Sequence, residues 1–248
     1  MFFKQTIDDA CKYIVKGVDI KSSFKTSDKG GIKEKEWVEE VKGNEVKETL
    51  YKPRHKDSLF WCYYMLVHGL AACETVGNKQ FIIEKNEKIK LVELVRTKKT
   101  TLKFHKMAPL SSIESDLTSS GTISISTFFA ICIASDLCLL YIDKVNKTWL
   151  HILEEERGDT VNVLYRSEDS QRFECKTDVP ASIINTVEKT YYKLFSMNKP
   201  IQSLSSYKTS ELLEICAKVG VDIYLQGSSG KTHPKQHLYN AIKTKLGV

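Results

Sequence analysis

The chain has 248 residues, of which 42% are hydrophobic and 27% charged, with 12 Gly and 5 Pro. This ordinary globular composition excludes collagen-like, low-complexity and fully disordered proteins. Seven cysteines without short paired spacings argue against a secreted disulfide scaffold and favour a reducing compartment. No apolar run reaches the roughly 18 residues of a membrane span. The first residues lack the apolar core of a signal peptide, so we expect a soluble protein without a membrane partner.

Charge is unevenly distributed along the chain, whose net charge is +6. Residues 79–106 contain nine basic and three acidic side chains, and residues 200–248 contain six and three. Residues 107–199 contain nine basic and thirteen acidic side chains, so the middle of the chain would repel a polyanion. The two basic stretches would attract one. The alternative is that these lysines only solvate exposed faces.

The first half of the chain predicts helices and a charged arm. Apolar residues at helical spacing predict a short helix over 6–16, and the Lys- and Glu-rich residues that follow, to residue 52, predict a flexible arm. Asp57 and Ser58 are typical helix starts, the apolar run 59–67 predicts a core helix, and Gly69 is a typical helix end. Further helices are expected over 80–106, around 113–117 and over 126–135, the last of them buried.

The residues after 136 change from helical to strand-like periodicity. Short strands are expected at 137–142, 148–153, 160–165 and 172–175, which together predict an antiparallel meander. Pro180 is expected in the first turn of a helix. The apolar face of that helix is formed by Ile183, Ile184, Val187, Tyr191 and Leu194.

These elements predict an α+β fold in three parts. Residues 1–52 form an N-terminal helix and arm, and residues 53–199 form a mostly helical core with a small antiparallel meander. Residues 200–248 form a small C-terminal module of two helices joined by an extended segment, after a Ser-, Asn- and Pro-containing boundary near 198–203.

The C-terminal module has the sequence pattern of two amphipathic helices joined by an extended segment and a loop. Thr209 is expected to cap its first helix, which ends at Gly220. An extended segment over 221–225 and a loop over 226–230 follow. Thr232 is expected to cap the second helix, with Pro234 in its first turn. The apolar stripes of the two helices are Leu212, Ile215, Cys216 and Val219, and then Leu238, Ile242 and Leu246.

Residues 203–247 resemble the SAP and Rho-N-terminal-like family of helix-extension-helix modules. The matching motifs are Ser-Tyr-Lys-x-x-Glu-Leu from residue 206, Cys-Ala-Lys-x-Gly-Val from residue 216 and Lys-x-x-Leu-Tyr-x-x-Ile from residue 235. The resemblance implies nucleic-acid binding through backbone charge, and a helix N-terminus is a natural phosphate site. The candidate contacts in the module are Lys208, Lys218, Lys231, Thr232, His233, Lys235, Lys243 and Lys245, and those in the basic stretch are Lys98, Lys99 and Lys103.

The string Lys-Asp-Ser-Leu-Phe-Trp-Cys-Tyr-Tyr at 56–64 carries a second resemblance. With the elements that follow it, it resembles an uncharacterised protein family of nucleocytoplasmic large DNA viruses, the giant viruses, over about residues 50–248. The resemblance implies a viral protein in the virion or in a factory in the host cytoplasm, with no enzymatic activity and no cofactor.

The residues bear on three kinds of catalytic or ligand site. Cys62 in a buried helix, with His151 on a strand, is loosely similar to papain-like and ovarian-tumour-like hydrolases, and the form expected is inactive because residues 171–173 lack a histidine. His233 and His237 are one helical turn apart without further ligands, which argues against zinc. The Gly-Lys-Thr sequence at 230–232 lacks the first glycine of a phosphate loop.

The sequence thus predicts a non-enzymatic viral protein that binds the DNA or RNA backbone without sequence preference. The alternative is a virion structural protein, for instance a minor capsid component, whose lysines contact other virion proteins. The second alternative is the inactive hydrolase fold.

Overall fold

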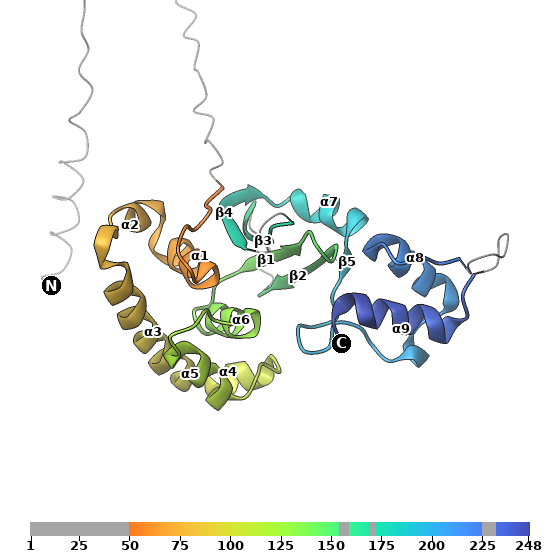
Figure 1. The fold of residues 1–248 in the computed structure, drawn as a ribbon, viewed down its shortest axis with the longest axis horizontal. Helices are drawn as coiled ribbons and strands as arrows, with labels where there is room; N and C mark the ends of the chain where they lie inside the picture. Colours follow the sequence, from red (N-terminus) through yellow and green to blue (C-terminus); the bar gives the residue numbers. More distant parts are fainter. Residues whose placement is uncertain (1–49, 154–158, 169–171, 225–231) are drawn as a thin grey trace, which may run out of the picture. The chain divides into compact units, whose positions relative to one another are not determined.

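The computed structural model describes residues 50–153, 159–168, 172–224 and 232–248, which belong to one compact unit. The expected helix over 6–16, the arm as far as residue 49, the loop over 226–230 and Lys231 lie outside these residues. The helices (Figure 1) are α1 (Ser58–His68), α2 (Leu70–Glu74), α3 (Gln80–Thr97), α4 (Lys99–Phe104), α5 (Leu110–Thr118), α6 (Ile125–Ala134), α7 (Ile183–Thr190), α8 (Thr209–Val219) and α9 (Lys235–Leu246), with short 3-10 turns at Gly77–Lys79 and Leu204–Ser206. The strands are β1 (Leu139–Asp143), β2 (Thr148–Ile152), β3 (Thr160–Arg166), β4 (Phe173–Pro180) and β5 (Tyr192–Lys193).

The α+β class is confirmed, but the predicted antiparallel meander is wrong. The strand order is β4-β3-β1-β2-β5. β1 pairs antiparallel with β2 and parallel with β3, and β5 pairs parallel with β2, so the sheet is mixed. The reason is the burial of β1, all five of whose residues are buried. A strand that is apolar on both faces belongs in the centre of a sheet with a neighbour on each side.

Two further expectations near the end of the sheet are wrong. Pro180 ends strand β4, opposite Thr160, and does not begin a helix, because β4 extends five residues beyond the predicted end at 175. Helix α7 ends at Thr190, before the expected Leu194. The chain turns there because the N–H groups of Tyr192 and Leu194 donate to carbonyl oxygens of Lys147 and Trp149 beside β2.

The two faces of the sheet carry different covers. On one face, Leu139 and Tyr141 of β1 join a large apolar cluster with the buried residues of α1, α3, α5 and α6. Helix α1 packs on β4 and α6 packs on β2. On the other face, Leu140 and Ile142 join a smaller cluster that α7 covers. Helix α1 begins and ends as predicted, since the Asp57 carboxylate caps it and Gly69 follows it with φ 82°.

A third apolar cluster begins at Ile201 and holds α8 against α9. Both predicted stripes lie in this cluster: Leu212, Ile215, Cys216, Val219, Leu238 and Ile242 are buried, and Leu246 is half-buried against them. The Lys218 ammonium donates to the backbone oxygen of Glu188 in α7 at 2.9 Å. The division between residues 53–199 and 200–248 stays a prediction.

Candidate functional site

The C-terminal module has the expected order of helix, extended segment and helix, but the caps differ from the prediction. Helix α8 begins at Thr209, and Lys208 is its N-cap, with the backbone N–H of Lys208 donating to Glu211 Oε2 at 2.6 Å. Helix α9 begins at Lys235, and Pro234 is its N-cap. The expected cap at Thr232 is wrong, because Thr232 lies before the start of the helix, in the extended segment, where it pairs with Tyr224 in a β-bridge.

The lysines of the module occupy different environments. Lys208 and Lys245 are exposed, and Lys235 and Lys243 are half-buried. Within the part of the chain that the structure describes, none of these four forms a salt bridge. Lys218 is different, because its ammonium is held by the carbonyl of Glu188. Four of the predicted lysines of the module therefore reach solvent without an acidic partner among the described residues. The fifth, Lys218, is held in its contact with Glu188.

The two histidines of the module stack on each other. The rings of His233, in the extended segment, and His237, on α9, have centroids 3.9 Å apart and an interplanar angle of 15°. This contact fastens the end of the extended segment to the second helix. Among the described residues, no group of three or more His, Cys, Asp or Glu side chains is placed to hold a metal ion.

The basic stretch 79–106 is less positive at its surface than its sequence indicates. Lys88 is 5% exposed and is bound by Asp57 and Glu84, both at 2.8 Å. Lys98 pairs with Asp136 at 2.9 Å. Other ion pairs in this stretch join Lys90 to Glu87 and Arg96 to Glu114. Of the three residues predicted here as nucleic-acid contacts, Lys99 and Lys103 are exposed on α4 and Lys98 is engaged.

A wide cavity of about 570 Å³ lies between α3 and the loop that joins α5 to α6. Its polar wall is the cluster of Asp57, Glu84 and Lys88. Asp57 also accepts the N–H groups of Phe60 and Ile123, and Glu84 accepts the indole N–H of Trp61. Because these charges already have partners, the cluster serves to join α1, α3 and the start of α6.

Cys62 does not lie where a nucleophile is needed. It is fully buried in the second turn of α1, and the Cys175 thiol donates to its backbone oxygen at 3.7 Å. Burial raises the pKa of the Cys62 thiol well above its ordinary value, as do the neighbouring Cys175 and Glu174. The start of α1 is occupied by Ser58, whose hydroxyl accepts the N–H of Phe173 at 3.3 Å.

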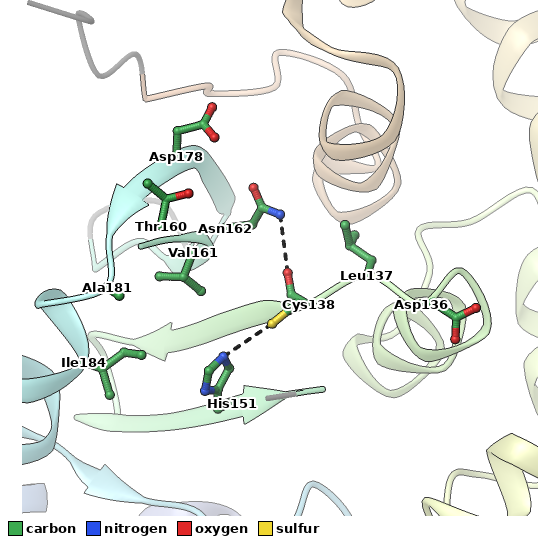
Figure 2. A pocket seen from close by; sticks show the side chains of 10 residues that line it. All are labelled: Asp136, Leu137, Cys138, His151, Thr160, Val161, Asn162, Asp178, Ala181 and Ile184. Atoms are coloured by element: carbon green, nitrogen blue, oxygen red, sulfur yellow. Dashed lines mark hydrogen bonds between the residues drawn. The ribbon is translucent and has the colours of Figure 1, made fainter. Parts of the chain in front are cut away.

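His151 lies beside a different cysteine, which the sequence did not single out. Its Nε2 is 3.6 Å from the Sγ of Cys138, in a cavity of the sheet (Figure 2). The sequence holds one signal for this proximity to His151, which is that Cys138 precedes Leu140 by two residues. That signal is informative only once the register between β1 and β2 is known.

None of the described helices has the length and apolar character needed to cross a membrane. The chain was compared with protein-family models, with curated proteins and with solved structures, and none of the three comparisons found a match.

Proposed function

We propose that this protein binds the phosphate backbone of nucleic acid through the lysines of its C-terminal module, without catalysing a reaction. The observation that carries the proposal is the state of Lys208, Lys235, Lys243 and Lys245. All four reach solvent, and none forms a salt bridge within the described residues. Lysines of this kind neutralise phosphates and release counterions, which supplies affinity without reading bases.

The composition of the module indicates what kind of binding to expect. Residues 200–248 contain no arginine, so the bidentate contact that recognises guanine is not available from them. Lys99 and Lys103 on α4 are a second candidate contact, because they are exposed and form no salt bridge within the described residues. Binding would therefore be weak, sensitive to salt and indifferent to sequence.

The resemblances add a biological setting to the proposal. The helix-extension-helix pattern is similar to that of SAP and Rho-N-terminal-like modules, and the 56–64 string is similar to a giant-virus family. Together they favour a viral protein that works in the virion or in a cytoplasmic factory. DNA and RNA backbones carry the same charged group, so both belong in the test.

The test is a salt series of binding to duplex DNA and to single-stranded DNA and RNA. We compare the unaltered protein with a triple variant, Lys235→Gln, Lys243→Gln and Lys245→Gln. The slope of log affinity against log salt should become shallower by about 2.7 on duplex DNA, since each neutralised phosphate contributes about 0.9. A matched control replaces three exposed lysines of the core, Lys147→Gln, Lys189→Gln and Lys199→Gln, and should leave the slope unchanged.

Two results would overturn the proposal. If both triple variants lose binding equally, the effect follows overall charge and not the module. If the module variant binds as well as the unaltered protein, its lysines do not contact nucleic acid. The virion structural role would then be preferred. That role is measured separately, as association with other virion proteins. If nucleic acid is the true ligand, the Gln variants should leave that association unchanged. Circular dichroism confirms that each variant folds.

A further inference from the structure

A thiol and an imidazole meet in a cavity of about 290 Å³ that opens beside β1, β2 and β3 (Figure 2). This cavity is separate from the lysines of the proposed function. The cavity is lined mainly by polar side chains, including those of Asp136, Cys138, His151, Thr160, Asn162 and Asp178. A concave site with a nucleophile, a base and a few polar groups is the usual form of a reactive site.

The sheet register brings the two reactive groups together. Leu140 of β1 lies opposite His151 of β2, and Cys138 precedes Leu140 by two residues. Residues two apart on an extended chain point to the same face of a sheet. Cys138 is therefore the diagonal neighbour of His151 on the face that α7 covers. This placement depends on the β1–β2 hairpin and not on a mobile loop.

The geometry suits proton transfer between the pair. Cys138 Sγ lies 3.6 Å from His151 Nε2, a hydrogen-bond distance for sulfur. The Asn162 amide donates to the backbone oxygen of Cys138 at 3.4 Å, which fixes the segment that carries the thiol. Both Cys138 and His151 are half-buried, so a small molecule in the cavity can reach the sulfur. A nucleophile and base within hydrogen-bond reach are the requirement for an activated thiol.

The other described cysteines provide an internal comparison. Cys62, Cys132, Cys175 and Cys216 are buried, and burial raises the pKa of the Cys62, Cys132 and Cys216 thiols. Cys73 is half-buried like Cys138, but burial and neighbouring groups raise its pKa as well. Reactivity of a cysteine requires both access and a means of forming the thiolate. Among the described cysteines, these conditions meet at Cys138.

We propose that Cys138 and His151 form a nucleophilic thiol site that takes a small, positively charged disulfide. His151 Nε2 accepts the thiol proton, and the Cys138 sulfur attacks one sulfur of the disulfide. The disulfide S–S bond breaks as the new bond to Cys138 forms, and the departing thiolate receives the proton from the imidazolium of His151. The products are a mixed disulfide on Cys138 and one free thiol, so the incoming disulfide is the oxidant.

The charges around the cavity determine the preferred reagent. The carboxylates of Asp136 and Asp178 line it, and Lys98 balances one of them through its 2.9 Å pair with Asp136. The net negative lining favours a cation over an anion. The volume is at the lower limit for ligand pockets, which restricts the reagent to a few atoms on each side of the disulfide.

The experiment measures mixed-disulfide formation on the full chain in a Cys11→Ser background, so that every remaining cysteine is a described one. Three disulfides of similar size are used: cystamine, which is cationic, 2-hydroxyethyl disulfide, which is neutral, and dithiodiglycolate, which is anionic. Peptide mass spectrometry locates the adduct. Cys138 should react first, at least roughly tenfold faster than Cys73. Cystamine should react roughly twofold to tenfold faster than the anionic reagent.

His151→Gln separates activation from mere access. At pH 7 its rate at Cys138 should fall roughly tenfold, since an ordinary thiol with a pKa of about 8.5 is only slightly ionised there. Above about pH 9 the two rates should converge, because solvent then supplies the thiolate. Adduct formation first at Cys73 would overturn the proposal, as would a rate at pH 7 that His151→Gln leaves unchanged. The ranking of cysteines needs no His151 variant, so it decides the matter even if His151→Gln does not fold.

Discussion

Lysines in the helical core and lysines in the C-terminal module have the same charge but opposite surroundings. Lys88 is almost wholly buried, bound by two carboxylates, and lies 5.3 Å from the centre of the Phe60 ring. Lys245 is exposed on the last turn of α9 without a salt bridge in the described part of the chain. A count of lysines along the sequence treats these two residues alike, whereas only the second is available to a phosphate.

This difference explains why the segment with the larger net charge is the weaker candidate for binding. The 79–106 stretch has a net charge of +6, but four of its nine basic residues are held by acidic groups, some of them far away in the sequence. The module has a smaller net charge, and its lysines have fewer partners. Accessible charge, not net charge, sets the number of counterions that a protein can release.

The largest expected effect is on stability, from breaking the charge cluster of the core. Asp57→Ala removes the cap of α1, the acceptor for Ile123 and the partner of Lys88 together. We expect the free energy of unfolding to fall by about 3–5 kcal/mol, because the buried Lys88 ammonium would keep Glu84 as its one acidic partner within the described residues and the N–H groups of Phe60 and Ile123 would lose their acceptor. Urea unfolding followed by circular dichroism measures this.

Lys98→Met is the matched control, because the Lys98–Asp136 pair is largely exposed. Its effect should stay below about 1 kcal/mol. Equal losses in the two variants would show that the buried cluster contributes no more than a surface pair, and the contrast between the core and the surface would then fail.

The same cluster predicts a loss of stability at high pH. Burial opposes the charge of Lys88, but the hydrogen bonds to Asp57 and Glu84 outweigh it and raise the pKa of the ammonium. A lysine pKa that is higher in the folded state than in the unfolded state stabilises the folded state. This stabilisation is complete at pH values below the unfolded pKa of about 10.4, and it is lost as the pH rises through the folded pKa. Unfolding measured between pH 9 and 12 should show this loss, and Lys88→Met should flatten it.

The next effect tests whether the module is stable apart from the core. Leu238 is fully buried in the α8–α9 cluster, so Leu238→Ala should destabilise that cluster by about 2–5 kcal/mol. Hydrogen exchange should then accelerate in α8 and α9 while α1 and α6 keep their protection. Leu139→Ala, in the large cluster, should give the reverse pattern. Uniform acceleration in either variant would mean that the two parts unfold together.

Local elements could be read from the sequence, whereas their partners could not. The caps at Asp57 and Gly69, the apolar run of α6 and the stripes of α8 and α9 are short-range signals, and these elements appear where expected. The position of β3 next to β1 depends on burial of β1 from both sides, which joins residues far apart in the sequence. The Cys138–His151 pair depends on the same register, and Lys88 finds Asp57 at a distance of 31 residues. Such contacts between residues far apart in the sequence cannot be predicted from the periodicity of apolar residues.

A smaller effect concerns the end of α8. Gly220 has φ 73°, a left-handed conformation that side chains with a Cβ disfavour, and its N–H closes the helix on Cys216. Gly220→Ala meets no steric contact, so its cost of about 1–2 kcal/mol should come from the backbone alone. Thermal unfolding measures it. Gly121→Ala, at a glycine without a positive φ, should cost less, and an equal cost would remove the conformational explanation.

The smallest effect distinguishes two lysines within the module itself. Lys218 donates to the carbonyl of Glu188, so it has to give up that bond before it can reach a phosphate, whereas Lys245 is exposed. Lys245→Gln should therefore make the salt dependence of duplex binding shallower by about 0.9, and Lys218→Gln should change it much less. Lys218→Gln should instead lower the stability of the contact between α7 and α8, seen as faster hydrogen exchange at the C-terminus of α7. If the two variants change the slope equally, the bond to Glu188 does not hold Lys218 away from nucleic acid, and every lysine of the module would have to be counted as a contact.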